Sequence, residues 1–187
     1  MLNELFLKNR SYRRFSNKRR VKTEELRLMI ESARLAASGA NRQRIRYALV
    51  NDKNECDRIF SELKFAAYLK DWQGPTEEER PAAYVIFMTE SENLDTVLAI
   101  DFGIAAEAIL MTAVEMGLGG CIFRSFNKEN VEKILSKDGY NAGLVIALGE
   151  PSEVAYVTEV KNGDIKYFRD EKDNHAVPKY TVDELII

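Results

Sequence analysis

The sequence predicts a single domain of the α/β or α+β class, because predicted helices and strands alternate along its 187 residues. One observation is the stretch 97–116, which is apolar on nearly every helical face and is therefore expected to form a buried central helix. Another is a pair of nearly unbroken apolar runs, 82–88 and 142–148, typical of strands covered on both faces. A chain of this length also suits one sizeable hydrophobic core.

The composition excludes several classes of protein. A hydrophobic fraction of 45% and a charged fraction of 30% are ordinary for a soluble globular protein. The net charge of −3 argues against a protein whose whole surface binds nucleic acid. Cys56 and Cys121 lie far apart and His175 is the single histidine, so neither a disulfide framework nor a zinc site is predicted, and a reducing cytoplasm is expected. Three carboxylates interrupt the central helix, which is therefore not expected to span a membrane.

The chain begins with a short amphipathic helix around residues 2–6, followed by a basic segment at 8–22. That segment holds eight Lys or Arg residues and no Asp or Glu. From charge alone it is most simply a solvated loop. A sharper hypothesis is an anion site in which the guanidinium groups of Arg10 and Arg13 and the hydroxyl of Ser11 contact phosphate oxygens. Polynucleotide binding is weakened because the segment contains only two aromatic residues.

A helix is predicted at 23–37, with Thr23 as its N-cap. The small, amide-rich loop 38–43 follows, and two interpretations stay open for it. It is either a helix C-terminal turn or a place where a flat ligand binds, with Asn41 and Gln43 hydrogen-bonding the edges of a heterocycle. The remaining predicted elements are strands at 45–50, 120–123 and 165–168, a helix at 55–69, and a helix from the capping residue Asn127 to Leu135.

The C-terminal part has weaker periodicity. Its last residues, 185–187, are too apolar to trail in water, so the tail is expected to dock on its own subunit or on a partner. His175 is interpreted as structural, because it has no recognisable acid or nucleophile partner for catalysis. The polar segment 71–81 is predicted at the surface, where Tyr68 or Trp72 either covers a pocket or simply packs.

Five stretches occur in the order found in the FMN-dependent nitroreductase family, which the sequence resembles over nearly its whole length. They are NRSYRRF, ASGANRQ, DFGIAAEAILMTAVEMGLGGCIF, ALGEP and KYFRDEKDNHAVPKYTVDELI. The resemblance implies an α+β fold, with a mixed, mainly antiparallel sheet surrounded by helices. It further implies one domain over 1–187 in an intertwined homodimer with FMN at the subunit interface, and a segment at about 165–187 that packs on the partner.

The same resemblance assigns ten residues to the FMN site. The phosphate is expected at the Arg10 end of the site, the pyrimidine edge of the flavin at a basic side chain, and N5 and O4 at backbone N–H groups at the end of a strand. In chain order the cofactor-binding residues are Arg10 and Ser11 for the phosphate, Tyr12 beside them, Arg13 for the pyrimidine edge, Ser38, Gly39 and Asn41 from the other subunit, Phe123 and Arg124 for N5 and O4, and Lys179 for the phosphate.

The function implied by the family is ping-pong transfer of hydride from NADH or NADPH through FMN to a nitroaromatic or quinone. No catalytic side chain is needed, because the flavin carries the chemistry. The chain departs from the family pattern at Asn9 and Tyr180, where two basic residues are lost, and at Arg124, which either crowds the flavin or selects anionic substrates. Further departures are at Ala37 and at 44–45. The rival hypotheses are a flavin-binding protein with little turnover and, more remotely, a nucleic-acid-binding module.

Overall fold

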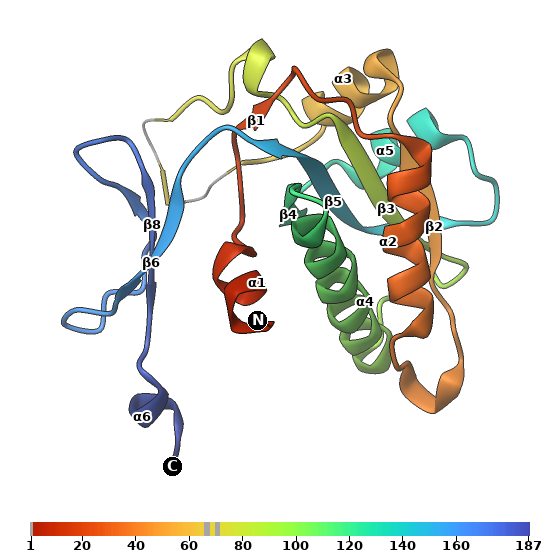
Figure 1. Cartoon of the computed structure of the whole chain (residues 1–187). Coiled ribbons are helices and arrows are strands. Elements are labelled where there is room, and N and C mark those ends of the chain that lie inside the picture. The colour runs from red at the N-terminus through yellow and green to blue at the C-terminus, as the bar shows by residue number, and fades with distance from the viewer. Residues whose placement is uncertain (1, 66–67, 70–71) are drawn as a thin grey trace.

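The fold is built on a central antiparallel sheet, seen in the computed structural model, which describes residues 2–65, 68–69 and 72–187 (Figure 1). The strand order is β1-β5-β3-β2, and β4 also pairs with β5. Every strand pair of this sheet is antiparallel, which confirms the α+β prediction. The strands are β1 (Phe15–Ser16), β2 (Arg46–Val50), β3 (Ala83–Thr89), β4 (Gly119–Phe123) and β5 (Asn141–Pro151).

Helices cover both faces of this sheet, as expected from its apolar strands (Figure 1). Along β3, Val85 and Phe87 belong to the core cluster that contains residues of α2 and α4, whereas Tyr84 and Ile86 belong to the cluster under α3 and α5. All residues of β3 are buried, so alternate side chains fill two separate cores. The helices are α2 (Thr23–Leu35), α3 (Lys53–Ser61), α4 (Thr96–Glu115) and α5 (Lys128–Leu135).

The central helix α4 forms where it was predicted, but one of its faces is uncovered. Its N-cap Asp95 accepts a hydrogen bond from the Leu98 amide at 2.8 Å and receives both terminal nitrogens of Arg44, at 2.6 and 3.0 Å. Ile100 is 57% exposed and Ile104 is 38% exposed. The helix is long and apolar enough to cross a membrane, yet half of its most apolar window is buried, as in the core helix of a soluble protein.

A second, three-stranded sheet lies beside the first and was largely missed from sequence. Its order is β6-β8-β7, and β6 and β8 run parallel. Only the strand at 165–168 was predicted, and it is shorter and later than expected. In Figure 1 this sheet stands near the short helix α1, and the C-terminus extends away from both. The elements are α1 (Leu2–Lys8), β6 (Ala155–Glu159), β7 (Phe168–Arg169), β8 (His175–Lys179) and α6 (Val182–Leu185).

Several predicted helix boundaries were wrong: α2 ends at Leu35 rather than Ala37, and α3 begins at Lys53 rather than Glu55. The helix predicted at 55–69 ends at Ser61, because the following backbone pairs with the β4–α5 loop: the Lys64 amide donates to the Ser125 carbonyl at 3.0 Å. Residues 66 and 67 of that prediction lie outside the described part of the chain. The N-cap of α2 is Lys22 rather than Thr23, and the Lys22 amide donates to the Glu25 carboxylate at 2.8 Å.

Candidate functional site

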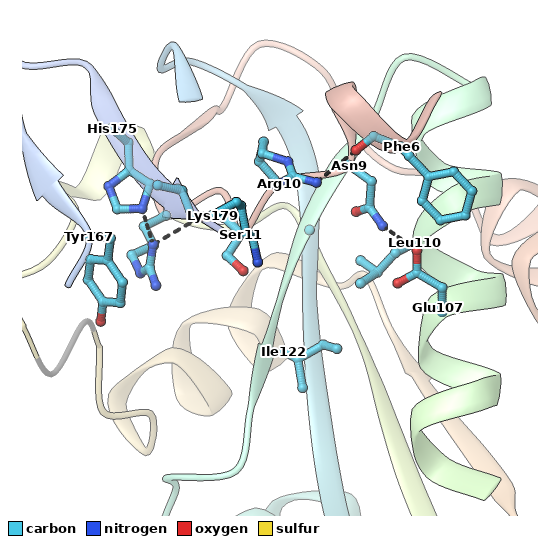
Figure 2. Close-up of a pocket in the computed structure, with 13 residues that line it drawn as sticks. Phe6, Asn9, Arg10, Ser11, Glu107, Leu110, Ile122, Tyr167, His175 and Lys179 are labelled. Atoms are coloured by element: carbon cyan, nitrogen blue, oxygen red, sulfur yellow. Dashed lines mark hydrogen bonds between the residues drawn. The ribbon is translucent and has the colours of Figure 1, made fainter. Parts of the chain in front are cut away.

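A cleft of about 310 Å³ opens where α1, α4, β4 and the second sheet meet (Figure 2). We call it the Arg10 cleft. Four of the predicted site residues line it, although they come from opposite ends of the chain: Arg10, Ser11, Arg13 and Lys179. The other lining residues are Phe6, Asn9, Glu107, Leu110, Gly120, Ile122, Tyr167, His175 and Val177.

The lining of the Arg10 cleft suits an anion attached to an apolar group. Three cationic side chains line it against a single carboxylate, that of Glu107. The Glu107 carboxylate accepts a hydrogen bond from the Asn9 amide at 2.9 Å, so Asn9 holds it in place. Apolar side chains, among them Leu110 and Ile122, form another part of the lining. Positive charge beside an apolar wall matches a phosphate carried by a planar heterocycle.

The Arg10 guanidinium is fixed at one end and has a free donor at the other. Its Nη2 donates to the Phe6 carbonyl at 2.7 Å, near the carboxyl end of α1. Its Nε is buried and has no hydrogen-bond partner within the described residues. Tyr12 does not line the cleft; its hydroxyl donates to the Lys8 carbonyl at 2.9 Å. Both side chains therefore anchor the end of α1, and Arg10 keeps a donor for a ligand.

Arg13 is buried and held from three sides. Its backbone amide donates to Glu153 Oε1 at 2.5 Å, and its Nη1 lies 2.7 Å from His175 Nε2. Its guanidinium carbon lies 4.4 Å from the centroid of the Tyr167 ring, within cation–π range. Together these contacts fix the position of the positive charge of Arg13 before any ligand binds.

The pairing with Arg13 requires a neutral His175. Burial lowers the pKa of this histidine to about 4, and the positive charges of Arg13 and Arg169 act in the same direction. Because Arg13 can only donate, Nε2 accepts and the proton of the neutral ring sits on Nδ1, which has no hydrogen-bond partner in the described part of the chain. His175 thus has a defined partner, which the sequence could not reveal because Arg13 lies near the other end of the chain.

This histidine predicts a pH dependence of stability. Its folded-state pKa lies below its unfolded value, so the unfolded chain binds more protons between about pH 6.5 and pH 4. The His175 contribution is complete above that window and is lost as the pH falls through it. Urea unfolding measured between pH 7 and pH 4.5 should show that the free energy of unfolding falls as the pH falls. In His175→Gln the slope of this dependence should be smaller, by up to about one bound proton. Equal slopes in the two proteins would contradict this assignment.

Glu153 is a site residue that sequence reasoning missed. Its side chain is 2% exposed, accepts the backbone amides of Arg13 and Arg14, and lies 2.5 Å from Arg169 Nη2. No local pattern distinguishes it from the many surface carboxylates of the chain. Its importance arises only from the folding of the segment after β5 against the basic segment.

The other predicted site residues lie elsewhere in a single chain. The Gly39 amide donates to Asp101 Oδ1 at 2.7 Å. Asp101 precedes Glu107, the first α4 residue that lines the Arg10 cleft, by six residues, or about 9 Å along the helix axis, and Ser38 lines a different pocket together with Asp101. Ala40, Asn41 and Gln43 have positive φ, a conformation that costs free energy in non-glycine residues.

The end of β4 divides its side chains between two faces. The Phe123 side chain is buried on the α3–α5 side, 4.8 Å from Phe65 between ring centroids. Arg124 lines a separate cleft.

Trp72 and Tyr68 both pack against other aromatic rings. The Trp72 ring contacts Phe65, and the Tyr68 ring lies 5.0 Å from that of Tyr167, which lines the Arg10 cleft.

FMN fits the donors that are present. The cationic side chains of Arg10, Arg13 and Lys179 suit its phosphate, and the apolar wall suits its ring system. Within the described residues, no group of three or more His, Cys, Asp or Glu is arranged to hold a metal ion. Cys56 and Cys121 are buried free thiols.

Comparison with known proteins agrees with this fold. A nitroreductase family protein from Streptococcus pneumoniae TIGR4 is 17% identical, with a TM-score of 0.68 over 100% of this chain and 99% of that chain. An FMN-dependent nitroreductase from Clostridium difficile R20291 is 21% identical (TM-score 0.62; 80% and 87% covered). An NADPH:FMN oxidoreductase from Vibrio harveyi, complexed with NAD+, is 20% identical (TM-score 0.65; 85% and 72% covered).

At these identities the structures establish a shared fold. No curated protein matches the chain. The family model for the nitroreductase family matches residues 7–150, which include β1 to β5 and the basic segment. The chain therefore belongs to the nitroreductase family.

Proposed function

We propose that the protein is an FMN-dependent oxidoreductase that oxidises NADH or NADPH and reduces an electron-poor acceptor of the nitroaromatic or quinone class. The observation that carries this proposal is the convergence of Arg10, Ser11, Arg13 and Lys179 on one cleft with an apolar wall. FMN-dependent and NADPH-linked proteins share the fold, which supports the same cofactors here.

Within this proposal, Arg10, Ser11 and Lys179 hold the FMN phosphate, and Arg13 contacts the pyrimidine edge. Bound FMN supplies the group that accepts and donates hydride. Arg13 stabilises negative charge on that edge, and its preorganisation by Glu153, His175 and Tyr167 means that little reorganisation accompanies reduction. No side-chain nucleophile or general acid is assigned.

We also propose that the active unit is a homodimer with two such sites at its interface. The exposed stripe on α4, including Val97, Ile100 and Ile104, runs along the helix to Glu107, which lines the Arg10 cleft. A second copy on this stripe would bury its apolar side chains and bring the loop 38–41 of the partner toward the cleft. The segment at about 165–187 would pack on the partner, consistent with the exposed Leu185, Ile186 and Ile187.

Ile104→Glu is expected to convert the dimer to a monomer at micromolar concentration. Each dimer would bury two added carboxylates in an apolar contact, which costs several kcal/mol when they are unpaired. Sedimentation equilibrium measures the association state, and FMN titration measures the predicted loss of cofactor binding. Asn54→Glu, on α3 at the opposite face of the sheet, is the matched control and should remain dimeric. An Ile104→Glu dimer as stable as the unmodified one would rule out this interface.

Steady-state kinetics test the proposed reaction. With NADH or NADPH and a quinone as varied substrates, double-reciprocal plots should give parallel lines, because both substrates use the same face of the cofactor in turn. Intersecting lines would contradict the ping-pong scheme. The alternative is a flavin-binding protein with little turnover, in which the departures from the family pattern at Asn9, Arg124 and Tyr180 have lowered catalysis. Such a protein would bind FMN that NADH and NADPH fail to reduce.

A further inference from the structure

A second cleft, of about 270 Å³, lies near the C-terminal end of β4. We call it the Arg124 cleft. It is enclosed by the loop between β3 and α4, the start of α5 and the start of β5. Its lining residues are Thr89, Ser91, Glu92, Asn93, Leu94, Arg124, Phe126, Lys128, Asn141, Ala142 and Gly143.

The Arg124 cleft contains a cation that is oriented but not neutralised. Arg124 Nη1 donates to the Gly143 carbonyl, which fixes the guanidinium while leaving its other N–H groups available. Arg124 forms no ion pair with any residue that the structure describes. Lys128 Nζ lies 3.3 Å from Asn141 Oδ1 and 3.7 Å from Glu132 Oε1, with which it forms an ion pair. Glu92 is the one carboxylate of the lining, and Arg124 is the cation there that forms no ion pair with a described carboxylate.

The geometry of β4 connects this cleft to the Arg10 cleft. Ile122 lines the Arg10 cleft, and Figure 2 shows its side chain below the cluster formed by Arg10 and Ser11. Arg124 is the first residue after the end of β4 at Phe123, two residues beyond Ile122 and about 7 Å further along the extended chain. The intervening Phe123 points into the opposite core. A flat molecule lying along this edge would therefore extend from Ile122 to Arg124.

We infer that the Arg124 cleft binds the anionic substituent of the electron acceptor, so that the preferred acceptors are quinones or nitroaromatics that carry a carboxylate or sulfonate. This inference rests on the proposed function and adds a substrate class to it. Guanidinium groups match the geometry of such anions, and Thr89 adds a hydroxyl group to the lining. The overall reaction converts NAD(P)H, one proton and the quinone into NAD(P)+ and the hydroquinone, and the substituent takes no part in it.

The test compares a neutral naphthoquinone with the same quinone carrying one sulfonate. In Arg124→Gln, kcat/KM for the sulfonated quinone should fall about 10- to 50-fold more than kcat/KM for the neutral quinone, as expected for loss of a charge-assisted hydrogen bond. Arg124→Lys should restore part of the loss. Arg58→Gln, which removes an exposed arginine from α3, is the control for net charge and should change neither value.

Equilibrium binding gives a second readout that does not depend on turnover. Naphthalene-2-sulfonate, which is not reduced, should bind the FMN-saturated protein more weakly in Arg124→Gln by a similar factor, measured by isothermal titration calorimetry. Equal losses for both quinones, or no loss for either, would overturn the inference while leaving the proposed function intact. No turnover of the neutral quinone by the unmodified protein would instead overturn the proposed function, and the inference with it.

Discussion

Glu153→Ala is expected to destabilise the protein by about 3–5 kcal/mol, because it removes a buried carboxylate that is the closer of the two ion-pair partners of Arg169, the other being Asp173 at 3.9 Å. The Glu153 side chain is 2% exposed and lies 2.5 Å from Arg169, whose own side chain is 15% exposed. The same carboxylate accepts the backbone amides of Arg13 and Arg14, which would lose their partner inside the protein. The loss of the shorter Arg169 ion pair and of the acceptor for two backbone amides in one place makes this the largest single loss that we expect.

Urea unfolding monitored by circular dichroism measures this effect. Glu153→Gln should lose less, since its carbonyl oxygen still accepts the backbone amides while the charge is gone. Glu171→Ala, at an exposed carboxylate in the loop between β7 and β8, is the control and should change stability by less than about 0.5 kcal/mol. A Glu153→Ala protein as stable as the control would show that the contact with Arg169 contributes nothing.

Arg13→Gln is expected to weaken FMN binding about 10- to 150-fold, the equivalent of about 1.5–3 kcal/mol for hydrogen bonds to a charged group. The arginine is preorganised by His175 Nε2 at 2.7 Å and by the Tyr167 ring, so its loss removes a donor that is already aligned. Titration of the apoprotein with FMN, followed by quenching of flavin fluorescence, gives the Kd.

The neighbouring arginine provides a matched control for this variant. Arg14 points away from the cleft, over the Trp72 ring and into ion pairs with Glu79 and Asp173. Arg14→Gln removes the same charge one residue further along, and should leave FMN affinity within about 3-fold of the unmodified protein. If both variants weaken FMN equally, the effect is one of net charge and the specific role of Arg13 is wrong.

Strong local patterns allowed the main sheet and central helix to be predicted from the sequence. The apolar run of β3 and the all-round apolar character of α4 are local properties that the buried environment requires. The second sheet was missed because β6 and β8 are short, partly exposed and paired across a loop, so neither has a hydrophobic period of its own. The end of α3 was missed because tertiary hydrogen bonds to the β4–α5 loop override a helical pattern.

Some residues of the candidate site could likewise be predicted from the sequence, and others could not. Arg10, Ser11 and Arg13 are visible as a cluster in the sequence, and the family resemblance adds Lys179. Glu153, Tyr167 and His175 were not identified, because their contacts with Arg13 join positions far apart in the chain. The placement of Ser38, Gly39 and Asn41 at an FMN site stays a prediction that depends on a second subunit.

The visible absorption spectrum of the purified protein, recorded without oxygen before and after addition of NADH or NADPH, tests the central proposal most directly. We expect flavin bands that disappear when the nicotinamide is added and return when a quinone follows. Absence of flavin bands even after incubation with FMN would contradict the assignment of the Arg10 cleft as a flavin site.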